Sequence, residues 1–391
     1  MIEKLVRKEI LGFQPYVPGK PVGEVRRELG IKGKIIKLAS NENPGGPSQE
    51  VVKAMKKSLA GVNRYPDGSS HLLRKAIAIR CGVSDREIIL GSGVDEIIEL
   101  IGKTFFDPSD EVIVSEHAFI RYRMAAELMG CRVVNVPMKG YRHDLVAMAG
   151  AVTKKTKAIF IANPNNPTGT YNTSDEIKEF LAGVSDARGG ANAGTRPLVI
   201  FDEAYYEYAR AEKGYPDTIE IYKKKVYPNL IIMRTFSKIY SLAGLRVGWA
   251  VANGEIIDFL DRARPPFNVN SVAQAGAMAS LKNSARNRKR LHQAVSAVRE
   301  GKEYLYGELE KSGFPFVSSA ANFVLVDVSP RKGKEVFNLL LKKGIIVRSV
   351  DEYGFPNHIR VTVGAADENR TFIRKIKEIQ RERQNDSRYQ E

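Results

Sequence analysis

The stretch RTFSKIYSLAGLRVGW, residues 234–249, holds one lysine, Lys238, among threonine, serine, alanine, glycine and aromatic residues. Apolar runs rich in β-branched residues flank it, NLIIMRTFS (229–237) on one side and LRVGWAVAN (245–253) on the other, and both are predicted to be short buried strands. Solvated lysines usually occur in groups of mixed charge. An isolated amine at the end of a buried strand therefore points to chemistry rather than to solubility.

The same strand pattern continues on the N-terminal side of this stretch. Further apolar runs are EIILGSG (87–93), EVIVSE (111–116), CRVVNVP (131–137), KAIFIANP (157–164) and PLVIFDEAY (197–205), and helix-length segments separate most of them. Strands that alternate with helices predict an α/β fold, a mostly parallel sheet covered by helices on both faces. Sites in such sheets lie beyond the carboxyl ends of the strands.

The pattern changes after about residue 266. A long helical stretch, roughly 270–312, precedes the predicted strands NFVLVDV, IIVRSV and HIRVTVG and the predicted helices GKEVFNLLLKKG and DENRTFIRKIKEIQRER. This pattern is typical of a smaller α+β domain. We predict three parts: an arm that also belongs to the small domain (1–48), a large domain (49–266) and a small C-terminal domain (267–391). A loop, ARGGANAGTRP (187–197), is expected between a helix and a strand of the large domain.

The composition is that of an ordinary globular enzyme, with 43% hydrophobic and 27% charged residues in 391. No apolar run reaches the roughly 18 residues that a membrane helix needs, and the start MIEKLVRKEILGF does not resemble a signal peptide. Cys81 and Cys131 have no paired spacing, so both are expected to be small buried residues in a reducing compartment. We therefore expect a cytoplasmic protein without a membrane partner.

The net charge of +16 raises the possibility of a nucleic-acid partner. The lysines and arginines are, however, scattered among acids, and the densest groups, KNSARNRKR (282–290) and IRKIKEIQRER (373–383), have helical spacing. Solvated helix faces explain them better than a nucleic-acid site does. We expect no nucleic-acid partner, and a basic nucleic-acid-binding protein remains a remote alternative.

Four predicted strand ends carry unusual groups. One leads into the Asn-Pro turn of FIANPNNPTGT, one into the glycines and helix start of GSGVDEII, one ends at Asp202, and one at Thr235, Ser237 and Lys238. Each is ambiguous alone: Asn and Pro are default turn residues, Asp202 could cap a helix, and Gly-x-Gly is a weak phosphate signal. Together they match pyridoxal phosphate, whose aldehyde takes a lysine amine, whose ring nitrogen takes a carboxylate and whose phosphate takes backbone N–H groups and an arginine.

Three motifs resemble the signatures of the fold-type I, class-II aminotransferases in their order and spacing: TFSKIYSLAGLRVG, NPNNPTG and DEAYYEY. A narrower resemblance, to the histidinol-phosphate aminotransferase family, rests on six further motifs: FQPYVPGKP, LASNENPGGPS, NRYPDGS, GSGVDEIIEL, ANFVLVD and HIRVTVGAADEN. This resemblance covers nearly the whole chain. It implies a pyridoxal-phosphate enzyme of histidine biosynthesis that converts histidinol phosphate and 2-oxoglutarate to imidazole-acetol phosphate and glutamate, and a homodimer with shared active sites.

The resemblance also implies roles for individual residues. Three are catalytic: Lys238 attaches to the cofactor, Asp202 pairs with its ring nitrogen, and Tyr205, with Asn166, bonds the ring hydroxyl oxygen. The phosphate is expected to contact Val94, Asp95, Thr235, Ser237 and Arg246, and Tyr65 of the neighbouring subunit. The substrate is expected to contact Asn166, Arg348 and Arg360, and Tyr16 of the partner subunit. From alternation alone, the two strand arginines could equally lie on a solvated sheet face.

One segment departs from the family. Many members have Pro-Thr before the aromatic residue that stacks on the ring, whereas this chain has His117 and Ala118. Phe119 is the candidate for stacking and Tyr122 the second choice. A lone histidine such as His117 more often satisfies a local hydrogen bond than it serves a site. No metal-binding spacing is present.

Lys238 is expected to do two jobs. It holds the cofactor, and once freed its amine moves a proton from the substrate carbon to the cofactor. That transfer needs a neutral amine, so we expect burial and the neighbouring Arg246 to lower the pKa of Lys238.

Two other classes of pyridoxal-phosphate enzyme, aromatic aminotransferases and threonine-phosphate decarboxylases, share almost all of these motifs and remain alternatives. A dinucleotide-binding dehydrogenase would need GxGxxG after its first strand, where this chain offers only GSGVDE.

Overall fold

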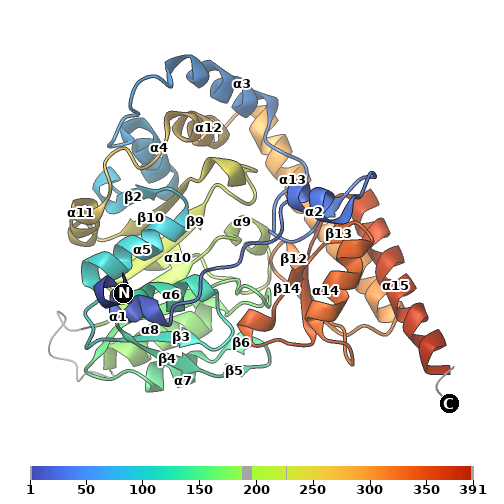
Figure 1. Ribbon diagram of the computed structural model, residues 1–391. Helices are drawn as coiled ribbons and strands as arrows, with labels where there is room; N and C mark the ends of the chain where they lie inside the picture. Colours follow the sequence, from blue (N-terminus) through green and yellow to red (C-terminus); the bar gives the residue numbers. More distant parts are fainter. Residues whose placement is uncertain (1, 187–195, 226, 389–391) are drawn as a thin grey trace.

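The computed structural model describes residues 2–186, 196–225 and 227–388, and its largest element is a seven-stranded sheet in the order β2-β10-β9-β8-β7-β3-β4 (Figure 1). The strands are β2 (Ile88–Gly91), β3 (Glu111–Ser115), β4 (Arg132–Val136), β7 (Thr156–Ala162), β8 (Leu198–Asp202), β9 (Leu230–Thr235) and β10 (Gly248–Ala252). β10 runs antiparallel to both of its neighbours, and the other pairs in this sheet are parallel. The predicted mostly parallel sheet is confirmed.

Helices cover both faces of this sheet because nearly every strand residue is apolar. Successive strand residues point to opposite faces, so Ile159 and Ile161 of β7 belong to one core, and Ala158 and Phe160 to the other. One core is closed by α5 (Val94–Phe105), α6 (Ile120–Leu128) and α11 (Gly254–Ala263). The other is closed by α4 (His71–Cys81), α7 (Leu145–Gly150), α8 (Ser174–Asp186), α10 (Thr218–Lys223) and α12 (Ser271–Leu281).

A second unit is built on an antiparallel sheet in the order β11-β12-β15-β14. Its strands are β11 (Phe316–Val317), β12 (Phe323–Asp327), β14 (Arg348–Ser349) and β15 (His358–Thr362), and α14 (Gly333–Lys342) and α15 (Ala366–Arg388) pack on one face. The run IIVRSV, predicted as one strand, is two. β13 (Ile345–Ile346) pairs with β1 (Ile36–Lys37) of the N-terminal arm, whereas β14 pairs with β15. The chain changes sheets at Val347, which a local apolar pattern cannot show.

The predicted helical stretch 270–312 is interrupted. α12 ends at Leu281 and α13 (Ala285–Lys311) begins after Ser284, whose side chain accepts a hydrogen bond from the backbone N–H of Asn287. α12 packs on α3 (Gln49–Ser58) and α4, which belong with the large sheet. α13 spans both units, because Ala294 and Val298 join the core of the large sheet while Leu305 and Leu309 join that of the small one. The packing favours a division within α13 rather than at residue 266.

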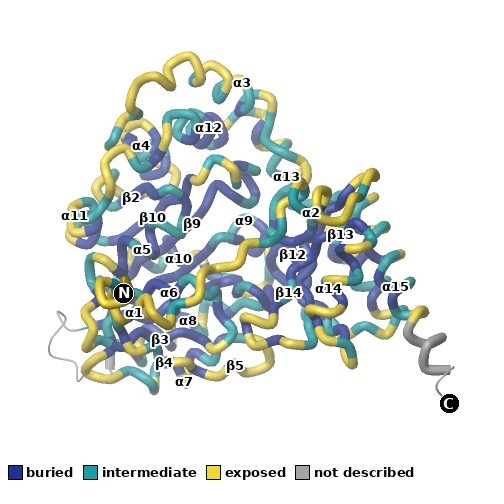
Figure 2. The backbone as a smooth tube through the Cα atoms, in the orientation of Figure 1, coloured by how far each residue is buried: buried dark blue, intermediate teal, exposed yellow. Residues whose placement is uncertain are grey.

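The N-terminal arm crosses between the two units. It contains α1 (Lys8–Leu11) and α2 (Val22–Leu29), and the segment that joins them is largely exposed, as the yellow tube in Figure 2 shows. The remaining short elements are β5 (Met138–Lys139), β6 (Arg142–His143) and α9 (Tyr206–Ala209). Cys81 and Cys131 are buried and free, as predicted. The loop expected at 187–197 lies mostly outside the described residues. A search of the described helices finds none with the length and apolarity to span a bilayer.

Candidate active site

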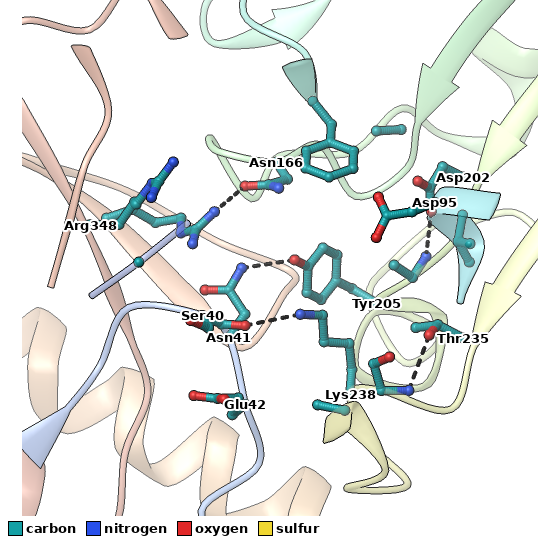
Figure 3. Close-up of a pocket in the computed structure, with 18 of the residues that line it drawn as sticks. Ser40, Asn41, Glu42, Asp95, Asn166, Asp202, Tyr205, Thr235, Lys238 and Arg348 are labelled. Atoms are coloured by element: carbon teal, nitrogen blue, oxygen red, sulfur yellow. Dashed lines mark hydrogen bonds between the residues drawn. The ribbon is translucent and has the colours of Figure 1, made fainter. Parts of the chain in front are cut away.

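A cavity of about 310 Å³ lies where the carboxyl ends of β7, β8 and β9 face β14 and β15 (Figure 3). Its lining includes thirteen of the fourteen residues predicted for the site: Tyr16, Val94, Asp95, Phe119, Asn166, Asp202, Tyr205, Thr235, Ser237, Lys238, Arg246, Arg348 and Arg360. The four strand ends therefore meet in one place. The fourteenth residue, Tyr65, does not line the cavity.

Lys238 follows β9, and its amine donates a hydrogen bond to the backbone oxygen of Ser40 at 3.0 Å. Burial lowers the pKa of Lys238 to about 8, and the guanidinium of Arg360 adds to that effect. Arg246, the arginine suggested by the sequence, contributes less than Arg360. Lowering the pKa makes a larger fraction of the amine neutral near physiological pH, which a proton acceptor requires.

Asp202 is the last residue of β8 and points into the cavity. Its Oδ2 accepts a hydrogen bond from the Tyr122 hydroxyl at 2.7 Å, and its Oδ1 accepts one from the backbone N–H of Ala204 at 3.1 Å. Burial raises the pKa of Asp202 to about 6, against the opposing effect of these hydrogen bonds. The helix-cap interpretation is wrong, because α9 begins at Tyr206 with Tyr205 in the cap position.

Phe119 and Tyr122 differ in what their rings already contact. The Tyr122 ring stacks on Phe160 with centroids 4.8 Å apart, and its hydroxyl is bound to Asp202. Phe119 meets Tyr122 edge to face at 5.6 Å. This arrangement favours Phe119 as the residue available for stacking on a ring in the cavity. His117 does not line the cavity; its Nδ1 lies 2.5 Å from the backbone oxygen of Tyr353, which is the local hydrogen bond expected of a lone histidine.

The N-terminal arm supplies residues to which the sequence assigned no role. Asn41 donates a hydrogen bond from its amide to the Tyr205 hydroxyl at 2.8 Å, and Ser40 accepts from Lys238. Figure 3 shows Lys238 and Tyr205 side by side, both directed at this segment of the arm, with Glu42 next to it. The motif LASNENPGGPS contains these residues, but only the tertiary contact between arm and sheet reveals what they touch.

The start of α5 forms the end of the cavity opposite the small sheet. Gly93 caps this helix with a φ of +80°, and a Cβ built on Gly93 would lie 2.3 Å from a guanidinium nitrogen of Arg246. Arg246 also donates to Asp95 at 3.0 Å, and Thr235 accepts a hydrogen bond from the backbone N–H of Ser237 at 3.0 Å. Unpaired N–H groups at a helix start, hydroxyls and a guanidinium suit a phosphate group.

The two strand arginines lie at the other end of the cavity. Arg348 and Arg360 are directly opposite one another across β14 and β15, so their side chains share a face of the small sheet. Both are buried, at 8% and 6% exposure, so the solvated-face interpretation is wrong. Arg360 donates to Asn166 at 2.5 Å and to the backbone oxygen of Ala39 at 2.6 Å, and among the described residues its Nε has no hydrogen-bond partner. Two buried cations that line one cavity, one of them with a spare Nε donor, indicate an anion site.

The two tyrosines predicted to come from a partner subunit differ. Tyr16 lines the cavity of its own chain, with its ring 5.5 Å from the Arg348 guanidinium, so the expectation that a partner supplies it is wrong. The reason is the path of the arm, which crosses from one unit of the chain to the other. Tyr65 is 82% exposed and stacks on Phe267 with centroids 4.6 Å apart, outside the cavity.

The donor set fits each polar group of pyridoxal phosphate. Lys238 would offer an amine to the aldehyde, Asp202 would offer a buried carboxylate to the ring nitrogen, and Asn166 and Tyr205 would hydrogen-bond the ring hydroxyl. The groups around Gly93 would hold the phosphate. The space that a Cβ at Gly93 would need is taken by the Arg246 guanidinium, and the positive φ there also favours glycine. Among the residues that the structure describes, no group of histidine, cysteine and acidic side chains could hold a metal ion.

Comparison with known proteins agrees with this geometry. The family of class I and II aminotransferases matches residues 33–376. The histidinol-phosphate aminotransferase of Moorella thermoacetica is 46% identical over 373 residues, 95% of this chain and 92% of that protein. That of Caldicellulosiruptor saccharolyticus is 42% identical over 375 residues, 96% of this chain and all of that protein.

Solved structures show the same fold. A histidinol-phosphate aminotransferase from Sinorhizobium meliloti, crystallised with pyridoxal-5'-phosphate, aligns with a TM-score of 0.84 at 24% identity over 96% of this chain and 98% of that one. Aspartate aminotransferase from Thermus thermophilus, crystallised with maleate, aligns with a TM-score of 0.81 at 20% identity over 96% and 99% of the two chains. The chain belongs to the class I and II aminotransferases and, within them, to the histidinol-phosphate aminotransferase family.

Proposed function

We propose that this enzyme uses pyridoxal phosphate to transfer the amino group of histidinol phosphate to 2-oxoglutarate, yielding imidazole-acetol phosphate and glutamate in histidine biosynthesis. The observation that carries the proposal is one cavity that holds the Lys238 amine and, facing it, the buried guanidiniums of Arg348 and Arg360. The relatives above 40% identity support it, because they carry the name of this activity over nearly the full length of the chain.

Bound pyridoxal phosphate supplies an aldehyde that takes up the substrate amine and a ring that stabilises negative charge on the substrate carbon. Lys238 then takes the proton from that carbon, since its amine, with a pKa of about 8, can be neutral. Asp202 holds a proton at the ring nitrogen, through a carboxylate that Tyr122 and Ala204 keep in place. Asn166 and Tyr205 orient the ring through its hydroxyl oxygen. Phe119 covers one face of the ring and excludes water from it.

Arg348 and Arg360 bind the anionic groups of each substrate. A guanidinium presents two parallel donors, which match both a phosphate and a carboxylate. We assign the phosphate of histidinol phosphate to both arginines, with the Tyr16 hydroxyl beside it. A carboxylate of glutamate or 2-oxoglutarate goes chiefly to Arg360, which already bonds Asn166 in the middle of the site.

The enzyme is proposed to act as a homodimer in which Tyr65 reaches the partner's cofactor phosphate. Tyr65 is exposed and outside its own cavity, and Leu59, Val62 and Leu72, close to it in the sequence, are also exposed. Exposed apolar side chains near a predicted site residue suit a surface that a second copy covers. We place the enzyme in the cytoplasm, a reducing compartment, where the free Cys81 and Cys131 thiols would persist.

The test is single-turnover kinetics of the purified enzyme with histidinol phosphate, glutamate, phenylalanine and threonine phosphate. Histidinol phosphate should react fastest with the wild type. Arg360→Ala should impair both half-reactions, whereas Arg348→Ala and Tyr16→Phe should impair histidinol phosphate more than glutamate. Loss of one charged partner in a buried site costs about 2–5 kcal/mol, or roughly 30- to several-thousand-fold.

Two results would redirect the assignment. If Arg348→Ala leaves histidinol phosphate unaffected, its phosphate binds elsewhere. If phenylalanine is the better substrate of the wild type, the aromatic aminotransferase alternative takes its place, and loss of carbon dioxide from threonine phosphate would favour the decarboxylase.

A further inference from the structure

The two buried arginines of the anion site differ in their charge partners. Arg348 forms an ion pair with Glu352, and no carboxylate within the described ranges pairs with Arg360, which donates instead to a side-chain amide and a backbone oxygen. Burial acts to lower the pKa of Arg348, but Tyr16 and, after it, the paired Glu352 outweigh burial, so the pKa is raised. Arg360 is thus an open receptor for an anion, whereas Arg348 already has a counter-ion.

Glu352 lies behind Arg348 as seen from the cavity. Arg348 lines the active-site cavity but Glu352 does not; it lines a neighbouring hollow of about 240 Å³ together with His117 and Phe119. The carboxylate is partly open to solvent, with 28% of the side chain exposed, while the Arg348 side chain is 9% exposed. A ligand that binds Arg348 from the cavity therefore need not displace Glu352, and it meets a guanidinium whose charge is already partly neutralised.

The turn that carries Glu352 is fixed in position. Glu352 is the middle residue of a 3-10 turn, Asp351–Tyr353, whose last residue bonds through its backbone oxygen to His117. The next residue, Gly354, has a φ of +80°, and a Cβ there would lie 2.7 Å from the His117 ring. The His117 ring also packs on Phe355 at 4.2 Å. The histidine that departs from the family pattern thus anchors the turn behind Arg348.

We propose that Glu352 is a specificity-determining counter-ion that weakens the phosphate subsite around Arg348. The inference rests on the proposed function, in which Arg348 receives the substrate phosphate. A phosphate dianion carries twice the charge of a carboxylate, so the Glu352 carboxylate repels it about twice as strongly at the same distance. Glu352 therefore lowers the affinity for phosphorylated ligands more than for dicarboxylates, and it speeds release of the phosphorylated product.

A role of Glu352 in merely orienting Arg348 makes the opposite prediction. Glu352→Gln keeps an oxygen that accepts the hydrogen bond from Arg348 but removes the charge. If orientation is the whole role, phosphate should bind the variant no more tightly than the wild type. If Glu352 is a counter-ion, phosphate should bind more tightly.

The experiment titrates inorganic phosphate into the holoenzyme by calorimetry and measures its inhibition constant against histidinol phosphate. The proteins are wild type, Glu352→Gln, Arg348→Ala, the double variant and Asp351→Asn. Asp351 is the matched control, because it is exposed on the same turn and its change removes the same charge. Glu352→Gln should bind phosphate about 3- to 20-fold more tightly, as expected from removing one charge roughly 5–12 Å from a dianion at an effective dielectric near that of water, because the Glu352 side chain is partly open to solvent. Its KM for histidinol phosphate should fall by more than its KM for glutamate, and Asp351→Asn should change neither.

The outcomes distinguish failure of the counter-ion role of Glu352 from failure of the proposed phosphate site. The counter-ion role is overturned if Glu352→Gln binds phosphate equally or more weakly, or if the change gives the same gain with and without Arg348. It stands if the gain disappears in the Arg348→Ala background. If Arg348→Ala alone leaves phosphate affinity unchanged, the proposed phosphate site itself fails, whatever Glu352 does.

Discussion

Asp202 and Lys238 are buried ionisable groups whose pKa values burial moves in opposite directions, up to about 6 and down to about 8. Each shift disfavours the charged form. For Lys238 that is an advantage, because the neutral amine accepts a proton. For Asp202 it is a cost, because in the proposed mechanism the carboxylate must stay ionised to pair with a protonated ring nitrogen, and the Tyr122 hydroxyl offsets part of that cost.

Asp202→Asn should therefore stabilise the apoprotein while it abolishes transamination. The folded-state pKa of about 6 lies above the ordinary value of 3.8, so the folded apoprotein binds more protons than the unfolded chain between these values. The free energy of unfolding thus falls as pH rises through that window, and the cost is fully present above it. At pH 7.5 the asparagine variant should gain about 1–3 kcal/mol, measured from the denaturant midpoint of the apoprotein.

Glu111→Gln is the control for this prediction. Glu111 is also buried, but Arg132 holds its pKa below the ordinary value, so its ionised form is favoured in the fold. The glutamine variant should lose stability at pH 7.5. An Asp202→Asn apoprotein that is less stable than wild type, or a holoenzyme that turns over normally, would contradict the role given to Asp202.

At the scale of elements, the turn between β2 and α5 shows how backbone geometry makes a binding site. Gly93 adopts a positive φ that side-chain-bearing residues rarely take, and the Arg246 guanidinium occupies the space beside it. β9 and β10 bring Arg246 and Ser237 to the same turn through their antiparallel pairing. The phosphate cradle is therefore a property of three strands and a helix start, and of no single motif.

Gly93→Ala should weaken binding of pyridoxal phosphate to the apoprotein. An added Cβ must displace Arg246 and hold a positive-φ conformation that costs about 1–3 kcal/mol, so the dissociation constant should rise about tenfold or more. An absorbance titration measures it. Gly254→Ala is the control: Gly254 also begins a helix after a strand, but its Cβ would lie 3.9 Å from the nearest atom, and no affinity change is expected. Equal affinities in both variants would argue against the cradle.

At the scale of the whole molecule, the arm and α13 join two separately cored units. The arm adds β1 to the small unit, lays Ser40 and Asn41 against the Lys238 region, and carries Tyr16 to Arg348. α13 contributes to both cores. The active site is thus assembled from both units and their connectors, and the proposed dimer would add Tyr65.

Hybrid dimers test whether Tyr65 contributes to the active site of the partner subunit. Lys238→Ala should reduce activity to below about 0.1% of wild type, as loss of a covalent catalytic group does, and Tyr65→Ala should weaken cofactor binding and activity. In a dimer of one subunit of each kind, one site would be whole if Tyr65 acts across the interface. After subunit exchange in an equal mixture, about a quarter of all sites should be intact. Exchange proven by mass spectrometry without recovery of activity would place Tyr65 in its own site or in none.

The large sheet and most of the cavity lining could be predicted from the amino-acid sequence alone. Its buried strands are short apolar runs bounded by turns, and the reactive residues follow directly at their ends, so local pattern and parallel topology bring Asp202, Lys238 and Asn166 together. The start of α5 could also be predicted from neighbouring residues, because Gly93 and the helix pattern after it are adjacent in the chain.

The contacts that join distant segments could not be predicted from the sequence and depend on tertiary packing. Four features depend on where the arm and the small sheet pack. They are the division of IIVRSV between two sheets, the bond of Asn41 to Tyr205, the place of Tyr16 in its own chain's cavity and the position of Glu352 behind Arg348. Periodicity reports which face of an element is buried, but not against what it is buried. Register and long-range packing settle that, because they depend on the free energy of the whole assembled core rather than on any local run of residues.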